Sequence, residues 1–156
     1  MFKKCKKISI ILSLFIILVT ISGCTIRQTS IIEEKFDSET MIEENGEYQS
    51  KEEVAKYIHI YKKLPSNYVT KSEAKKMGWP DEGTLDEILP GKSIGGDKFG
   101  NYENKLPSFS GRTYKECDID YSGGKRNAKR IVYSNDGNIY YTEDHYNSFE
   151  HLYGDD

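Results

Sequence analysis

Arg112-Thr-Tyr-Lys-Glu-Cys-Asp-Ile-Asp-Tyr121 has the alternation of a half-buried β-strand. From Tyr114 onward the acidic side chains fall on one face, and Cys117 and Ile119 fall on the other. We therefore predict a strand from Tyr114 to Tyr121, with Glu116 on the polar face and Cys117 in the core. A buried cysteine in such a place behaves as a small hydrophobe, so we do not expect it to act as a nucleophile.

Gly123-Gly-Lys-Arg-Asn-Ala-Lys-Arg130 follows this strand after a serine and contains two arginines. The next strand is predicted from Lys129 to Ser134, so pairing of the two strands puts Arg130 across from Glu116 or Asp118. Arginines bind phosphate oxygens with two parallel hydrogen bonds. An acid, two guanidiniums and a later histidine are the groups needed to cleave a phosphodiester by general acid–base chemistry.

The segments outside this hairpin predict helices first and strands afterwards. Capping boxes at Ser50–Glu53 and Thr70–Glu73 begin two helices, which Leu64-Pro65 and Gly78 end. A third short helix is predicted from Thr84 to Leu89. Further strands are predicted at Ser93–Asp97, Asn138–Thr142 and Ser148–Tyr153, with a tight hairpin at Asn135-Asp-Gly137. This order favours an α+β fold, with short N-terminal helices packed on one face of an antiparallel sheet.

The N-terminus predicts export and attachment to a membrane. Four lysines fall in the first seven residues, and residues 8–21 are almost entirely apolar. Ile21-Ser-Gly-Cys24 resembles the lipobox of bacterial lipoproteins, which implies cleavage before Cys24 and a lipid on its thiol. The alternatives are an ordinary signal peptide with a chance cysteine, or an uncleaved anchor. We expect a signal peptide at 1–23, an acidic flexible spacer at 24–47 and the folded domain at 48–156.

Charge argues mildly against a nucleic-acid partner. The chain carries a net charge of −3, and residues 24–156 contain 18 basic and 25 acidic residues. Proteins that bind nucleic acid are usually basic, because they neutralise phosphates. Only a local cluster of cations could therefore support RNA as a partner. Cys5 is removed with the predicted signal peptide, and Cys24 is predicted to carry the lipid on its sulfur. Cys117 is then the sole thiol, so we expect no disulfide within the mature chain.

Several motifs resemble the barnase–binase group of secreted microbial guanyl-preferring ribonucleases, and the resemblance covers Ser50 to Tyr153. The matching segments are Val54-Ala-Lys-Tyr, Leu64-Pro-Ser-Asn-Tyr-Val-Thr-Lys-Ser-Glu-Ala74, Gly78-Trp79, Pro90-Gly-Lys-Ser-Ile-Gly-Gly-Asp97, Lys105-Leu-Pro, Ser110-Gly-Arg-Thr113, Arg126-Asn, Arg130-Ile, Tyr133-Ser and Asp144-His-Tyr146. The resemblance implies cleavage of single-stranded RNA without metal or cofactor, through a 2′,3′-cyclic phosphate.

The resemblance also implies a role for each candidate catalytic residue. Glu116 matches the general base and His145 the general acid, while Lys71, Arg126 and Arg130 match the cations around the phosphate. Each residue also has a structural alternative. Glu116 and Arg130 could form a surface ion pair, His145 could be a turn histidine, and Lys71 could be solvated. Two further residues, Asp118 and Arg112, are predicted to make structural ion pairs, Asp118 with Arg126 or Arg130.

Phe99-Gly-Asn-Tyr-Glu103 matches the segment that binds guanine in the family. Glu103 would accept hydrogen bonds from guanine N1 and N2, and the backbone amides of Asn101 and Tyr102 would donate to O6. His145 and Tyr146 could offer a stacking surface for the base. Tyr102 stands where the family usually has an arginine, which should weaken phosphate attraction and binding of an acidic inhibitor protein of the barstar type.

These predictions combine into a monomeric, lipid-anchored endoribonuclease on the extracellular face of the membrane, where proteolysis of the spacer could release it. The main alternative is a lipoprotein of the same fold that binds RNA or a protein with little or no turnover. A structural envelope lipoprotein is a third possibility, but it leaves the five candidate catalytic residues unexplained.

Overall fold

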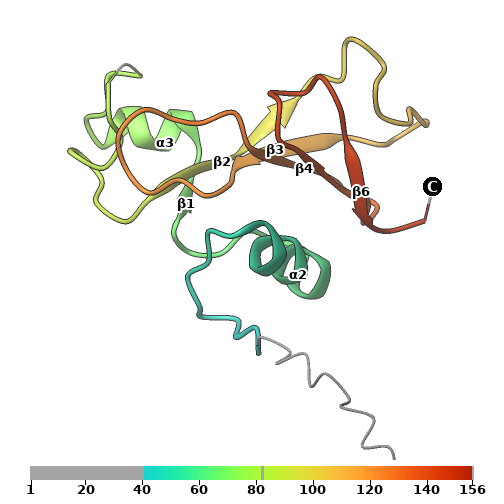
Figure 1. Ribbon diagram of the computed structural model, residues 1–156, viewed down its shortest axis with the longest axis horizontal. Coiled ribbons are helices and arrows are strands. Elements are labelled where there is room, and N and C mark those ends of the chain that lie inside the picture. Colours follow the sequence, from blue (N-terminus) through green and yellow to red (C-terminus); the bar gives the residue numbers. More distant parts are fainter. Residues whose placement is uncertain (1–40, 82, 156) are drawn as a thin grey trace, which may run out of the picture. The chain divides into compact units, whose positions relative to one another are not determined.

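The computed structural model describes residues 41–81 and 83–155, which form one mixed sheet with two helices (Figure 1). The signal peptide, Cys24 and most of the predicted spacer lie outside these residues. The strands follow one another across the sheet in chain order. They are β1 (Tyr68–Val69), β2 (Ser93–Phe99), β3 (Tyr114–Asp118), β4 (Arg130–Ser134), β5 (Ile139–Thr142) and β6 (Glu150–Tyr153). Only the β1–β2 pair is parallel, and the four other pairs are antiparallel.

Both helices begin at the residues that the sequence predicts. Helix α2 (Lys51–Tyr61) has Ser50 as its N-cap, with the Ser50 hydroxyl accepting from the Glu53 amide at 3.3 Å, and it ends where Lys62 takes a left-handed conformation. Helix α3 (Lys71–Lys76) begins with a complete capping box between Thr70 and Glu73. The capping residues therefore fix both starting points.

The third predicted helix, Thr84 to Leu89, is wrong, because this segment forms turns. The Leu85 carbonyl accepts two hydrogen bonds within this segment, from the Leu89 amide at α-helical spacing and from the Ile88 amide at 3₁₀ spacing. The segment is bounded by Gly83, which has a φ of +79°, and by Pro90. Helix α3 is equally short but begins with a capping box, whereas the Thr84 hydroxyl is buried without a hydrogen-bond partner among the described residues and caps no helix.

The predicted strand from Tyr114 to Tyr121 ends early, at Asp118. Asp120 takes a left-handed conformation with a φ of +54°, so it leaves the strand face that it was predicted to share with Glu116. Its carboxylate instead pairs with Lys129. The hairpin at 135–137 is confirmed, since the Ser134 amide donates to the Asn138 carbonyl and Gly137 has a φ of +102°.

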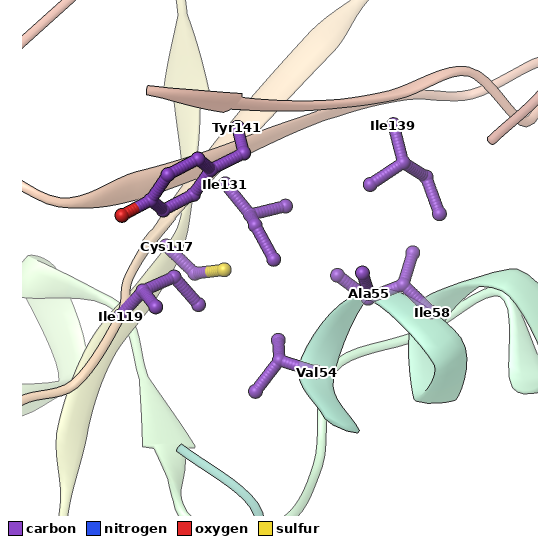
Figure 2. Packing of buried hydrophobic residues seen from close by; sticks show 8 residues of the cluster. All are labelled: Val54, Ala55, Ile58, Cys117, Ile119, Ile131, Ile139 and Tyr141. Carbon is purple, nitrogen blue, oxygen red and sulfur yellow. The ribbon is translucent and has the colours of Figure 1, made fainter. Parts of the chain in front are cut away.

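The main hydrophobic core lies between α2 and one face of the sheet. Figure 2 shows Val54, Ala55 and Ile58 of α2 directed toward side chains from β3, β4 and β5. Cys117 lies in this cluster with 1% of its surface exposed, as the strand alternation predicts. The opposite face of β3 carries Glu116, next to a smaller buried cluster of Leu106, Tyr114, Val132 and Tyr140. The α+β fold with a helix packed on an antiparallel sheet is confirmed.

The chain just before the predicted domain start contacts α2. The hydroxyl of Tyr57 donates to the Glu44 carbonyl at 2.7 Å, and that of Tyr61 donates to the Ile42 carbonyl at 3.0 Å. The last residues of the predicted spacer therefore lie against the helix. Within residues 41–81 and 83–155, no helix combines the length and apolar composition needed to cross a membrane.

Candidate active site

Glu116 lies in the middle of β3, on the face of the sheet away from α2. Its side chain is 15% exposed, and both carboxylate oxygens have a partner. The Tyr146 hydroxyl donates to Oε2 at 2.5 Å, and the Lys71 ammonium lies 3.5 Å from Oε1. These two contacts hold the carboxylate in one orientation. Oε2 is tightly bound by Tyr146, whereas Oε1 has only the more distant contact with Lys71.

Lys71 reaches Glu116 because a β-bulge brings the start of α3 to this face. The bulge lies between Gly95 and Asp97, with Gly96 at a φ of +94°, and it places Asp97 opposite Glu116. One oxygen of Asp97 accepts the backbone N–H of Lys71 at 2.9 Å. Asp97 therefore fixes the first turn of α3 beside the site. From the sequence, Asp97 is assigned only to a strand. The signal that could have indicated the bulge is the Gly95-Gly96 pair inside this strand.

Asp118 organises the two arginines, as predicted. Nε and Nη2 of Arg126 donate to its two oxygens at 2.6 and 2.7 Å, and the bidentate bond raises the pKa of Arg126. Nε of Arg130 lies 3.0 Å from Asp118 without hydrogen-bond alignment. The side chains of Asp118 and Arg130 are only 3% and 4% exposed, while Arg126 is 24% exposed. Arg126 is therefore the more accessible of the two guanidiniums.

The loop after β5 presents His145 and Tyr146. Both residues have left-handed backbones, with φ values of +55° and +73°. The Asp144 carboxylate holds the loop by accepting hydrogen bonds from Thr142 and from the backbone and hydroxyl of Ser148, and the Ser148 bonds lower the pKa of Asp144 to about 2. The imidazole of His145 is exposed at the loop surface.

Tyr146 contacts Glu116, which the sequence does not predict. Besides its hydrogen bond to Glu116, its ring packs on Phe99 and His145, with centroids 5.2 and 4.7 Å away. Burial, followed by the bond to Glu116, raises the pKa of Tyr146, and Arg130 opposes the rise. Because the ring is already packed, Tyr146 is held as a partner of the carboxylate rather than as an open stacking surface.

A cleft of about 420 Å³ joins β3, the loop after β2 and the loop after β5. Its lining residues are Lys98, Phe99, Gly100, Asn101, Tyr102, Glu103, Lys105, Glu116, His145, Tyr146, Asn147 and Phe149. All five predicted base-binding residues and both predicted proton-transfer residues are among them. The three predicted cations do not line the cleft. Lys71 contacts Glu116, which does line it, and the two arginines contact Asp118, two residues further along the chain.

The loop of residues 99–103 is shaped by its own side chains. Asn101 has a φ of +45°, and its amide both donates to the Leu106 carbonyl and accepts from the Leu106 amide. Glu103 forms an ion pair with Lys105 at 2.7 Å, and Lys105 also donates to the Tyr146 carbonyl. Lys105, which was not among the predicted site residues, thus links this loop to the one that carries Tyr146.

Cations that can bind phosphate oxygens, placed beside groups that can exchange protons, are typical of enzymes that cleave phosphodiesters. Comparison with known proteins agrees and is more specific, since residues 51–153 match the family model described as ribonuclease. The chain is 56% identical over 100 residues to proteins named ribonuclease from Heyndrickxia coagulans, Bacillus intermedius and Bacillus pumilus. This match covers 64% of the chain, 92% of the first relative and 62% of the other two.

The chain therefore belongs to the ribonuclease family, of the barnase–binase microbial type. Its substrate class is RNA, and its activity is the cleavage of RNA. Although the overall composition is acidic, three cations lie close together near Glu116, where they pair with Glu116 and Asp118.

Proposed function

We propose that this ribonuclease cleaves single-stranded RNA after guanosine, by transesterification to a 2′,3′-cyclic phosphate that water then opens. The observation that carries the proposal is the cleft that contains Glu116, His145 and the base-binding loop together. In the first step Glu116 takes the proton of the ribose 2′-hydroxyl, whose oxygen attacks the neighbouring phosphorus. His145 gives a proton to the departing 5′-oxygen, so no free alkoxide forms.

The cations stabilise the charge that gathers on the non-bridging oxygens. Asp118 uses the N–H of Nε and one N–H of Nη2 of Arg126, so both N–H groups of Nη1 and the second N–H of Nη2 remain for phosphate. The Lys71 ammonium lies on the Oε1 side of Glu116 and adds a further positive charge. The Tyr146 hydroxyl holds Oε2, which supports Oε1 as the atom that receives the proton.

Guanine is recognised by the loop of residues 99–103. Glu103 accepts from guanine N1 and N2, and the amides of Asn101 and Tyr102 donate to O6. In the free protein Glu103 pairs with Lys105, and the Glu103 side chain is 74% exposed. An ion pair exposed in this way is weak, so Glu103 exchanges it for the base at little cost.

The purified protein, supplied with GpU and with ApU in the presence of a chelator, tests this proposal. We expect rapid formation of guanosine 2′,3′-cyclic phosphate from GpU, and cleavage of ApU slower by at least tenfold. Equal rates for the two dinucleotides would contradict the guanine preference. Inhibition by the chelator would contradict metal-free chemistry.

The proposal extends to the location of the enzyme. The lipobox sequence supports anchoring by a lipid on Cys24 at the extracellular face of the membrane, and the enzyme is proposed to act as a monomer. Cys24→Ser should release the enzyme from the membrane fraction without changing its activity on GpU. Binding of an acidic inhibitor of the barstar type is also proposed, weakened by the absence of an arginine at Tyr102.

A further inference from the structure

A second cavity lies beside the guanine loop and is not used by the proposed reaction. It has a volume of about 420 Å³ and shares residues 98–102 with the catalytic cleft, so this segment forms a wall common to both. Its other lining residues include Ser108, Phe109 and Arg112. Neither Glu116 nor His145 lines it. A ligand that continues from the bound guanine over the shared wall would enter this second cavity.

Two aromatic rings line the second cavity and are largely exposed to solvent. Tyr102 is 93% exposed and Phe109 is 59% exposed. Exposed aromatic surface beside a polar cavity is typical of a binding site. The guanidinium carbon of Arg112 lies 4.5 Å from the centre of the Phe109 ring, and Arg112 is itself held by Asp136 at 2.7 Å. One face of Phe109 is therefore supported by a fixed cation, and the ring remains accessible elsewhere.

Lys98 supplies a positive charge at the boundary between the two cavities. It lies on β2, is exposed and lines both of them. Among residues 41–81 and 83–155, no carboxylate pairs with its ammonium. A phosphodiester that links a nucleotide in one cavity to a nucleotide in the other would pass this lysine. Aromatic faces combined with a cation are the elements that bind single-stranded nucleic acid without strict sequence preference.

We propose that the second cavity binds the nucleotide on the 5′ side of the guanosine, with its base stacked on Phe109 and Tyr102 and the connecting phosphate near Lys98. This inference rests on the proposed placement of guanine at residues 99–103. The nucleotide on the 3′ side departs from the phosphate beside Glu116 and His145, which line only the catalytic cleft. The second cavity therefore suits the upstream nucleotide, and purines should stack better than pyrimidines.

Cleavage of short substrates tests this subsite. We expect kcat/KM for ApGpU to exceed that for pGpU by about tenfold, the order expected for one stacked base. The pGpU control carries the 5′ phosphate without the upstream nucleoside. Phe109→Ala should abolish this gain and leave kcat/KM for GpU unchanged, whereas Phe109→Trp should keep the gain. Equal rates for ApGpU and pGpU in the unaltered enzyme would overturn the proposal and would favour a protein partner for the exposed rings.

Binding without turnover separates this proposal from the catalytic one. Calorimetric titration compares dApdG with 5′-dGMP, neither of which has a 2′-hydroxyl to react. Tighter binding of dApdG that is lost in Phe109→Ala supports the subsite, even if GpU is not cleaved and the proposed catalysis fails. Equal affinity for the two ligands, or no binding of either, overturns the subsite. Far-ultraviolet circular dichroism of Phe109→Ala checks that the variant is folded.

Discussion

Glu116 is held between two donors of different character. A phenol binds one oxygen at 2.5 Å and an ammonium lies 3.5 Å from the other. The sequence could place Glu116 on the polar face of its strand, because alternation along one strand is a local property. It could not reveal the bond from Tyr146, which lies 30 residues away and depends on two successive left-handed residues in a loop.

Tyr146→Phe tests the role of this phenol. The ring contacts with Phe99 and His145 should remain, so we expect little loss of stability. Loss of a hydrogen bond to a charged acceptor should lower kcat on GpU by roughly tenfold or more. Tyr133→Phe, on the opposite face of the sheet, is the control and should leave kcat unchanged. Full activity of Tyr146→Phe would show that the phenol does not position Glu116.

Asp118 is the residue on which the arrangement of both arginines depends. Asp118→Asn leaves Arg130 buried without a counter-ion, so we expect a loss of about 3–5 kcal/mol in the free energy of unfolding. Urea denaturation measures this loss. The control is Asp120→Asn, which breaks an exposed pair with Lys129 and should cost under about 1 kcal/mol. Similar losses in the two variants would contradict the structural role of Asp118.

At the level of the structural elements, the conformation of the loop after β5 is stabilised by hydrogen bonds to the carboxylate of Asp144. Asp144 has a pKa of about 2, compared with about 3.9 in an unfolded chain. Its stabilising contribution is therefore complete above about pH 4 and is lost as the pH falls toward 2. Asp144→Asn should lower Tm at pH 7, and the difference from the unaltered protein should shrink between pH 4 and pH 2.

Thermal unfolding followed by circular dichroism across this pH range measures the effect. Glu143→Gln is the matched control, because it removes a neighbouring exposed carboxylate. A difference in Tm between Asp144→Asn and the unaltered protein that stays constant from pH 7 to pH 2 would contradict the account of the loop.

The starts of both helices and the centres of the antiparallel strands could be predicted, because capping residues and alternation act over a few neighbouring positions. The prediction of a helix at Thr84–Leu89 failed, because Thr84 forms no cap there, whereas the equally short α3 is capped by Thr70. The short parallel strand β1 and the bulge at Gly96 were also missed. Both depend on contacts between segments far apart in the chain, including the one that brings Asp97 opposite Glu116.

At the scale of the whole molecule, charge is unevenly distributed. Residues 48–156 contain 16 basic and 18 acidic residues. Three of the basic residues nevertheless lie close together around the carboxylates of Glu116 and Asp118, namely Lys71, Arg126 and Arg130. Attraction of RNA should therefore come from this cluster and should be screened by salt. We expect kcat/KM on single-stranded RNA to fall steeply as ionic strength rises, with kcat changing little. A flat dependence would contradict electrostatic capture by the cluster.

The pairing of a carboxylate base with a histidine acid is the central claim, and the pH dependence of kcat/KM for GpU tests it most directly. The unaltered enzyme should give a bell-shaped profile, because Glu116 must be deprotonated and His145 protonated. Glu116→Gln should lose at least about a hundredfold in rate together with the acidic limb, and His145→Gln should lose the alkaline limb. A profile in which both limbs persist in both variants would contradict the claim.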